Sequence, residues 1–360
     1  MDTVNHSILI KKLEYYGVRG HCNAFFSSYL EDRKQFVFCN NVNSSVRNMV
    51  CGVPQGSVLG PTLFLLYVND MINCIRYSKL QLFADDTMSS LKGKKIHLLF
   101  GLMKRELKNL MHWFGANKLS LNASKTFYSY FHSRNSSIPD FFNTMTIDGI
   151  TIKRKKTAKY LGLTFDEVLS WRHHIENLLS GLAKYFNFFY HLRKILPMKF
   201  KLQLFHSYVY SKIAYGLHCY GAAHKTSLQS VQVVCNKLLR ILMLKDRKYP
   251  TNALYKECKI LKLDDFRKFL AAKFVHRSIY SDLYTPEQLK CYFMLNVDIH
   301  NRELRDNLKI RVPLLKSALG QTCIHWYGGN YWNNLDLSIR SESDLFAFKK
   351  LLRNYVINTY

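Results

Sequence analysis

The chain has 360 residues, of which 52 are Lys or Arg and 25 are Asp or Glu, giving a formal net charge of +27. Hydrophobic residues make up 48% and aromatic residues 14%, which is enough for a folded core and excludes an intrinsically disordered chain. No apolar run approaches the ~20 residues of a membrane span, and the N-terminal segment lacks the basic start and apolar stretch of a secretory signal. We therefore expect an intracellular protein, in the nucleus or the cytoplasm, without a membrane partner.

The positive charge is concentrated after residue 90. Residues 1–90 hold 8 Lys or Arg and 7 Asp or Glu, a balance of +1, whereas residues 91–360 hold 44 and 18, a balance of +26. A positive field spread along so much of the chain favours a partner with a regular array of negative charges, with nucleic acid ahead of an anionic membrane surface. Composition alone leaves open a basic surface without a partner.

The nine cysteines are odd in number, scattered, and nowhere in C-x-x-C spacing. This pattern argues against a disulfide framework and against a zinc ribbon, and it is typical of a reducing compartment. We expect the cysteines to be small buried hydrophobic residues.

Apolar spacing predicts a mixed first half and a helical second half. Helices are expected over 4–16, 63–75 and 98–114. Strands are expected at 36–39, 46–53, 80–84, 127–131 and 159–165, with a turn at Asn40–Asn41 and a loop at 54–61. After about residue 168, apolar residues follow single helix faces over 171–192, 202–213 and 231–242. The change predicts an α+β fold with two domains, residues 1–167 and residues 168–360.

Asp85 and Asp86 directly follow the apolar segment 80–84. Neighbouring residues on a regular strand point to opposite faces, so both carboxylates can address one point only at a turn or twist. Two carboxylates held together repel unless cations neutralise them, and Mg²⁺ is the usual cation beside phosphates. Two such ions ~3.5–4 Å apart can clamp the attacking and leaving oxygens of a displacement. A solvated turn without function is the alternative for the dipeptide alone.

The surroundings of this dipeptide form an ordered series of motifs. The series consists of Gly52–Pro61, Tyr67–Asp70, Phe83–Thr87, Leu121–Thr126 and Lys159–Gly162. In order and spacing it resembles the reverse-transcriptase palm of non-LTR retrotransposons of the jockey type. Asp2–His6 is similar to the end of that family's first motif, and Trp332–Leu335 and Phe348–Leu351 are similar to its C-terminal region.

The resemblance implies a role for each matching residue. Asp85 would be the metal-binding aspartate, with Asp86 as its partner, and the family uses two Mg²⁺ ions. Lys125 would lie near the leaving pyrophosphate, where a cation offsets developing charge or donates a proton. The residues expected against the templating base and the incoming nucleotide are Pro54, Gln55, Gly56, Phe83 and Ala84. Those expected to form the primer grip are Tyr160, Leu161 and Gly162.

The resemblance also implies a fold and partners. We expect an incomplete polymerase palm with an antiparallel sheet at 1–167, followed by a mostly helical, basic thumb and C-terminal extension at 168–360. The partners implied are an RNA template, a DNA primer or duplex, and a dNTP. Cations expected to contact phosphates lie at 153–156, 193–201 and 245–248.

One part of the family pattern is missing from the sequence. The first motif reads D-x-x-x-A-F-D-T-V in the family, and its first Asp binds both metals. Aligning its second Asp with Asp2 places Met1 at the aromatic position that excludes a ribose 2′-OH, and the first Asp falls before Met1. We therefore expect a chain truncated at its N-terminus and inactive alone. The alternatives are a non-catalytic nucleic-acid-binding module and an active enzyme whose true N-terminus was omitted.

Overall fold

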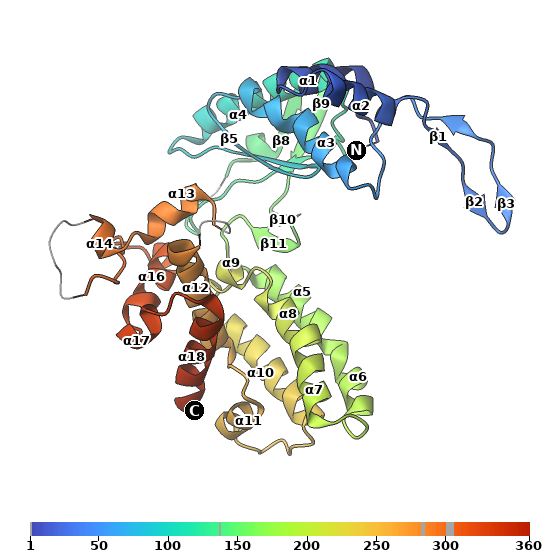
Figure 1. The fold of residues 1–360 in the computed structure, drawn as a ribbon. Coiled ribbons are helices and arrows are strands. Elements are labelled where there is room, and N and C mark those ends of the chain that lie inside the picture. The colour runs from blue at the N-terminus through green and yellow to red at the C-terminus, as the bar shows by residue number, and fades with distance from the viewer. Residues whose placement is uncertain (1, 137, 282–284, 300–305) are drawn as a thin grey trace. The chain divides into compact units, whose positions relative to one another are not determined.

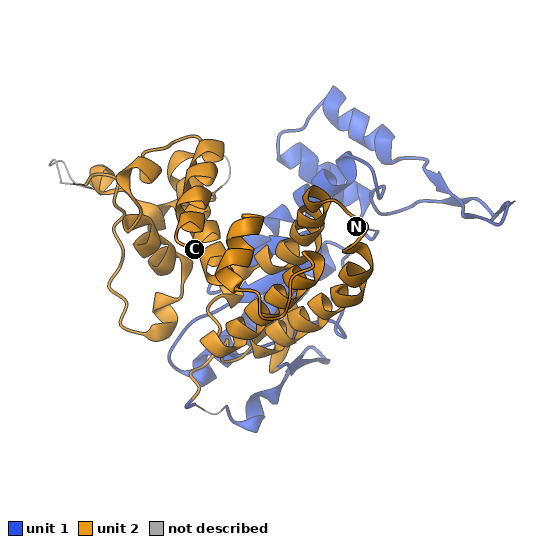
Figure 2. Ribbon diagram, turned by 90° about the horizontal axis from the view of Figure 1, so that it is seen from below, with its two compact units in different colours: residues 1–130, 135–155 blue, residues 131–134, 156–360 orange. Residues whose placement is uncertain are grey.

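The computed structural model describes residues 2–136, 138–281, 285–299 and 306–360. The chain divides into two compact units, coloured separately in Figure 2. Unit 1 comprises residues 1–130 and 135–155, and unit 2 comprises residues 131–134 and 156–360. The units therefore change over at residues 155/156, whereas the sequence places the domain boundary at 167/168. That domain assignment stays a prediction.

Four helical segments form the core of unit 1. They are α1 (His6–Tyr15), α3 (Leu59–Val68), the 3₁₀ helix η1 (Asn69–Cys74) and α4 (Ile96–Ala116). Their apolar faces meet in one cluster that includes Leu9, Leu13, Leu63, Tyr67 and Leu110. The helices expected at 4–16, 63–75 and 98–114 are confirmed, although the second consists of α3 and η1. A further helix, α2 (His21–Leu30), was not predicted.

An ion pair joins α1 to the first turn of η1. The Lys12 ammonium lies 2.7 Å from Asp70 Oδ1 and donates to the Tyr67 carbonyl oxygen at 2.6 Å. It also lies 4.8 Å from the centroid of the Tyr67 ring. Burial lowers the pKa of Lys12 and the carboxylate of Asp70 opposes that shift. The charge of this half-buried lysine is therefore compensated within unit 1.

A long hairpin projects from unit 1 after α2 (Figure 1). It contains β1 (Lys34–Gln35), β2 (Phe38–Cys39), β3 (Val42–Asn43) and β4 (Arg47–Asn48), with β1 paired to β4 and β2 to β3. Asn40 and Asn41 have φ of 49° and 61°, as the predicted turn requires. The strands are shorter than the sequence predicts, and their residues are exposed.

Two small sheets complete unit 1. The strands β5 (Lys79–Phe83) and β6 (Asp86–Ser90) form one antiparallel hairpin. The other sheet has the order β7–β9–β8, formed by β7 (Phe127–Tyr128), β8 (Thr144–Ile147) and β9 (Ile150–Arg154). The β8–β9 hairpin is antiparallel and β7–β9 is parallel. The α+β class is confirmed, but its strands belong to small separate sheets. The remaining element is the 3₁₀ turn η2 (Asp140–Asn143).

A buried carboxylate anchors the start of β5. Glu106 of α4 is 0% exposed and accepts hydrogen bonds from the Arg76 N–H at 3.1 Å and the Ser78 N–H at 3.3 Å. The Ser78 hydroxyl donates to the same carboxylate at 2.9 Å. Because Ser78 immediately precedes Lys79, these bonds fix the backbone at the point where the hairpin begins.

Unit 2 begins with a hairpin where the sequence predicts one strand. β10 (Thr157–Tyr160) and β11 (Leu163–Asp166) are antiparallel, and Tyr160 pairs with Leu163 across a two-residue turn. Leu161 and Gly162 form that turn with φ of 44° and 79°. The single strand expected at 159–165 is therefore wrong, because two consecutive residues with positive φ reverse the chain.

The rest of unit 2 is helical. Its longer helices are α5 (Arg172–Ala183), α6 (Tyr185–Leu192), α7 (Met198–Leu204), α10 (Lys225–Leu242), α11 (Thr251–Cys258), α12 (Leu263–Tyr280), α16 (Ile324–Asn333) and α18 (Leu345–Asn358). Shorter elements are the π-helix η3 (Phe205–Tyr210), α8 (Ser211–Ala214), α9 (Leu217–Tyr220), α13 (Glu287–Lys290), η4 (Cys291–Phe293), α14 (Asn296–Ile299), α15 (Ala318–Gln321) and α17 (Leu337–Arg340). The predicted helix at 171–192 is α5 followed by α6, and 202–213 spans α7, η3 and α8.

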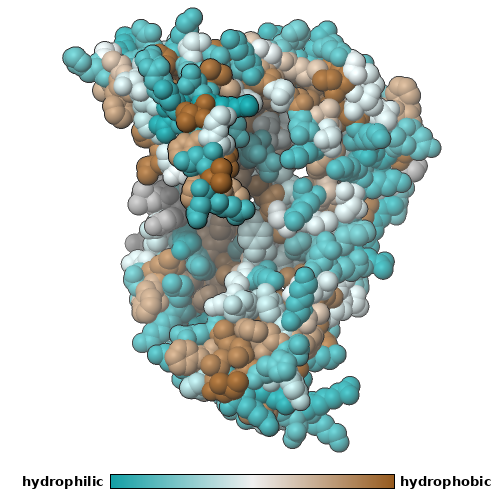
Figure 3. All heavy atoms as spheres, turned by 90° about the vertical axis from the view of Figure 1, so that its right-hand side faces the viewer, coloured by the Kyte–Doolittle hydropathy of each residue, from teal (hydrophilic) through white to brown (hydrophobic). Residues whose placement is uncertain are grey.

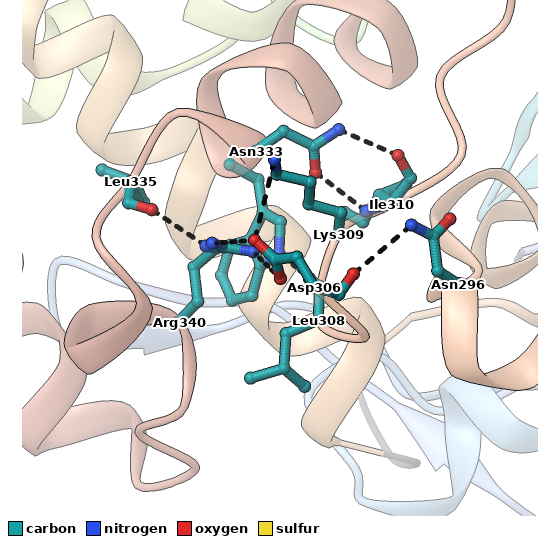
Figure 4. A network of polar contacts seen from close by, with 9 residues as sticks. Asn296, Asp306, Leu308, Lys309, Ile310, Asn333, Leu335 and Arg340 are labelled. Atoms are coloured by element: carbon teal, nitrogen blue, oxygen red, sulfur yellow. Dashed lines mark hydrogen bonds and ion pairs between the residues drawn. The ribbon is translucent and has the colours of Figure 1, made fainter. Parts of the chain in front are cut away.

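The segment Trp332–Leu335 has a structural role (Figure 4). The Asn333 amide accepts from the Ile310 N–H at 2.8 Å and donates to the Ile310 carbonyl oxygen at 2.9 Å. The Trp332 indole donates to the Leu308 carbonyl oxygen at 3.0 Å. Arg340 holds Asp306 through two charge-assisted bonds of 2.8 and 2.7 Å. These contacts attach residues 306–310 to α16 and α17.

The cysteine expectation is partly wrong. All nine cysteines are free, and only Cys235 and Cys258 are buried, while Cys74 is partly buried and the other six are exposed. None of the helices in the part of the chain that the structure describes combines the length and apolarity needed to cross a bilayer.

Four buried or partly buried histidines of unit 2, His174, His206, His218 and His276, have pKa values lowered by burial, so the stability of unit 2 depends on pH. Burial, assisted by Arg267 and Lys273, lowers the pKa of His218 to about 4. Burial also lowers the pKa of His276, whose ring stacks on Phe348. As the pH falls below about 6.5, the unfolded chain binds protons that the folded chain does not, so stability falls. Each histidine contributes at most ~1.4 kcal/mol per pH unit.

We expect the free energy of unfolding, from urea titrations, to decrease between pH 7 and pH 5.5, where exposed carboxylates stay ionised. His218→Gln should make this dependence shallower. His173→Gln is the control, because His173 is exposed on α5 and should leave the dependence unchanged. A stability that is constant or rises toward pH 5.5 would contradict the assignment.

The Glu106 anchor is tested by removing its carboxylate. Glu106→Ala leaves two N–H groups and one hydroxyl without an acceptor, so the free energy of unfolding should fall by about 2–4 kcal/mol. Hydrogen exchange should accelerate over residues 76–83. Glu14→Ala, an exposed position on α1, should change stability by about 0.5 kcal/mol or less. Equal effects of the two substitutions would show that the buried contacts do not anchor β5.

Candidate functional site

Asp85 and Asp86 lie at the tip of the β5–β6 hairpin. Phe83 pairs with Asp86, so Ala84 and Asp85 form a two-residue turn, in which Ala84 has a φ of 51°. Leu80 and Leu82 face the apolar core, which turns Gln81 and Phe83 to the solvent side of the hairpin. Asp86, opposite Phe83, shares that solvent side. The structure therefore places two adjacent exposed carboxylates at a turn, the geometry that both need in order to reach the same cation.

The loop Pro54–Gly56 contacts the N-terminal segment. The Gln55 side-chain amide donates to Asp2 Oδ1 at 2.7 Å. The Gly52 N–H donates to the Val4 carbonyl oxygen at 2.8 Å, and the His6 ring binds the Gly52 carbonyl oxygen at 2.7 Å. Gly52 has a φ of 90°, and a Cβ there would lie 2.8 Å from the Asp2 carbonyl oxygen. Two motifs 50 residues apart are thus brought together. Met1 lies outside the described residues.

The Ser57 hydroxyl shapes the other end of this loop. It donates to the Pro54 carbonyl oxygen at 2.7 Å and accepts from the Gly60 N–H at 2.9 Å. These two bonds close the loop against the first turn of α3. Gln55 and Gly56 are exposed between the Asp2 contact and this closure.

Lys125 is exposed on a turn between α4 and β7. The Asn122 side chain accepts from the Lys125 N–H at 3.2 Å and from the Ser124 hydroxyl at 2.7 Å. The Asn122 carbonyl oxygen accepts from the Thr126 N–H at 3.0 Å. Within the described ranges, no hydrogen bond or ion pair joins the Lys125 ammonium to Asp85 or Asp86.

The three predicted primer-grip residues belong to unit 2. Tyr160 ends β10, and Leu161 and Gly162 form the β10–β11 turn. The Tyr215 hydroxyl donates to the Leu161 carbonyl oxygen, and a Cβ on Gly162 would lie 3.1 Å from the Tyr215 ring. Tyr215 therefore holds the turn, a contact that the sequence pattern did not reveal.

The carboxylates at the hairpin tip meet part of what a Mg²⁺ site needs. No cluster of three His, Cys, Asp or Glu side chains is placed to hold a metal ion among residues 2–136, 138–281, 285–299 and 306–360. Mg²⁺ is commonly held by one or two carboxylates together with substrate phosphates. Asp85 and Asp86 fit that requirement for one ion. Among the described residues, no third carboxylate joins them to hold a second ion.

Sequence reasoning missed residues that position the site. Glu106 holds the start of β5, and Tyr67 accepts from the Asn5 N–H at 3.4 Å and donates to the Asn117 carbonyl oxygen at 2.6 Å. The sequence could have indicated Glu106, because this charged residue lies within the apolar stripe of α4, and a charge buried there needs hydrogen-bond partners. No comparable signal marks the partners of Tyr67, because they are backbone groups distant in the sequence.

Comparisons with known proteins show what the chain is similar to as a whole. Residues 1–165 match the family described as reverse transcriptase (RNA-dependent DNA polymerase). The chain is 28% identical over 260 residues to the RNA-directed DNA polymerase from mobile element jockey of Drosophila melanogaster. This alignment covers 69% of this chain and 28% of that protein. It is 28% identical over 222 residues to the probable RNA-directed DNA polymerase from transposon X-element of the same species, covering 60% and 24%.

A third relative is the probable RNA-directed DNA polymerase from transposon BS of Drosophila melanogaster, 26% identical over 257 residues, covering 67% of this chain and 27% of that protein. These alignments span about a quarter of the length of the curated relatives. Residues 1–165 are therefore similar to the reverse-transcriptase family, and the chain is homologous to the RNA-directed DNA polymerases of the mobile elements jockey, X-element and BS.

Proposed function

We propose that unit 1 carries the nucleotide-addition site of an RNA-directed DNA polymerase and that unit 2 binds the nucleic acid. The observation that carries this proposal is the exposed pair Asp85–Asp86 on an anchored hairpin, inside the part of the chain that matches reverse transcriptases. The family implies an RNA template, a DNA primer and a dNTP as partners.

The exposed residues of unit 1 suit the expected tasks. Asp85 and Asp86 would hold Mg²⁺, which when bound offsets the charge of the nucleotide phosphates and of the attacking 3′-oxygen. Gln55 and Gly56 would lie against the templating base and the nucleotide, with the Gln55 amide oriented by Asp2. Lys125, whose ammonium is not bonded to Asp85 or Asp86, would face the leaving pyrophosphate. Leu161 and Gly162 would contact the primer.

Unit 2 supplies most of the positive charge. Its residues include 33 Lys or Arg and 15 Asp or Glu, a balance of +18. Between α6 and α7, Arg193 and Lys194 lie beside exposed aromatic residues, and the Arg193 guanidinium stacks 3.3 Å from the centroid of the Tyr190 ring. Hydrophilic residues predominate on the face drawn in Figure 3. Cations with aromatic neighbours suit phosphate contacts along a duplex.

A specific observation favours a second candidate function. A two-ion mechanism uses a ligand shared between the ions, and no group of three His, Cys, Asp or Glu side chains in the described part of the chain is placed to hold a metal ion. We therefore expect nucleotide addition by this chain alone to lie several orders of magnitude below that of a complete site. The alternative function is a non-catalytic module that binds nucleic acid through unit 2.

Nucleotide-dependent complex formation separates these two functions without requiring turnover. The labelled probe is a DNA primer on an RNA template, and the measurement is its dissociation from the chain in Mg²⁺ with a competitor trap. We expect the complementary dNTP, but not a mismatched one, to slow dissociation about tenfold, equivalent to ~1.4 kcal/mol. Asp85→Asn should remove this discrimination and leave binding without dNTP unchanged.

Asp148→Asn is the matched control, since Asp148 is the first residue of the two-residue β8–β9 turn and Asn suits that turn equally. It should retain the discrimination. Binding without dNTP should weaken by ~10³–10⁵ between 50 and 200 mM salt if about 6–10 phosphates are contacted. Salt-sensitive binding without dNTP discrimination would reject the nucleotide site in favour of the binding module, and salt-independent binding would contradict both functions.

A further inference from the structure

A groove of about 670 Å³ with a mixed polar and apolar lining lies on unit 1, between α4 and residues 73–77 at the end of η1. The side chains that could bind a ligand there are Asn73, Arg76, Tyr77, Arg105, Asn109 and His112. On α4, Arg105, Asn109 and His112 recur at intervals of four and three residues and therefore share one side of the helix. Its volume is in the range typical of ligand sites, so the groove can hold a short part of one strand but not a duplex.

The positive charge of this groove is not neutralised by unit 1. No described residue forms an ion pair with the guanidinium of Arg76 or Arg105. The acidic residues of the surrounding segments are already engaged. Glu106 is buried and accepts from backbone N–H groups, and Asp70 is bonded to Lys12. Two arginines therefore face solvent in one concave site.

The groove is also rigid where it needs to recognise a ligand. The hydrogen bonds of Glu106 to Arg76 and Ser78 fix the backbone on both sides of Tyr77. The Tyr77 side chain is 52% exposed and so offers a ring face to a base. A preorganised aromatic ring beside two cations is the combination that binds single-stranded nucleic acid, by stacking a base and contacting its phosphates.

We propose that this groove binds a short single-stranded segment of polynucleotide, with Arg76 and Arg105 contacting two phosphates and Tyr77 stacking on a base. Asn73, Asn109 and His112 supply hydrogen-bonding groups for the sugar or base edges. Charge complementarity and the exposed ring together favour this occupant over an acidic peptide, which offers no base to stack. This proposal is based on the residues that line the groove and does not depend on nucleotide addition at Asp85.

The test uses the full chain and a labelled ten-nucleotide oligo(U), with binding followed by fluorescence anisotropy over a range of salt concentrations. Arg76→Gln combined with Arg105→Gln removes the two groove cations. Lys79→Gln combined with Lys104→Gln is the matched control, because it removes two exposed cations that lie near Arg76 and Arg105 in the sequence but outside the groove lining.

We expect the groove substitutions to weaken oligo(U) binding about tenfold or more at 50 mM salt. The slope of log K against log salt should become shallower by ~1.4, which corresponds to two single-strand phosphate contacts. The control substitutions should weaken binding by about threefold or less, since exposed charges are screened. The proposal would be overturned if both double variants lost the same amount of oligo(U) affinity. It would also be overturned if the groove variant lost as much affinity for a duplex as for oligo(U).

Cross-linking tests the proposal without altering the protein. Oligo(U) containing 4-thiouridine should cross-link on irradiation to peptides that contain residues 73–77 or 105–112, and cross-links confined to other segments would overturn the proposal. Oligo(dT) of equal length, carrying 4-thiothymidine, distinguishes an RNA from a DNA source for the strand. If the unmodified chain forms these cross-links but does not distinguish the complementary dNTP from a mismatched one, the nucleotide site is rejected and the groove proposal stands.

Discussion

The geometry of the candidate site depends on one buried carboxylate. Glu106 reaches from α4 to the backbone at Arg76 and Ser78 and fixes where the β5–β6 hairpin leaves the helical core. A two-stranded hairpin by itself is marginally stable in water, so the position of its tip depends on such an anchor. The same bonds present Asp85 and Asp86 at one end of the hairpin and orient Tyr77 at the other. One interaction therefore supports both the candidate nucleotide site and the proposed strand groove.

Unit 1 and unit 2 divide the expected tasks by charge. The carboxylates, the glutamine loop and Lys125 all belong to unit 1, which holds 19 Lys or Arg and 10 Asp or Glu, a balance of +9. The predicted primer-grip turn belongs to unit 2, which carries a balance of +18. This division is consistent with chemistry in one unit and backbone contacts in the other.

The sequence predicts local elements well where the apolar spacing is regular, as for α1 and α4. It also predicts that adjacent aspartates must lie at a turn, and the β5–β6 hairpin has that geometry. It fails at 159–165, where positive φ at Leu161 and Gly162 converts one strand into two. The β8–β9 hairpin was missed although Asp148–Gly149 is a favoured turn pair. Long-range contacts such as Gln55 with Asp2 leave no local pattern, so only the structure reveals them. The catalytic roles of the site residues stay predictions.

The central claim is that the Asp85–Asp86 turn holds a divalent cation. Replacing Mg²⁺ by Fe²⁺ with ascorbate and peroxide generates hydroxyl radicals at the bound ion, and mass spectrometry locates the resulting backbone cuts. We expect cuts around residues 84–87 that disappear in Asp85→Asn and persist in Asp148→Asn. Cuts that are unaffected by Asp85→Asn, or that occur only in other segments, would contradict it.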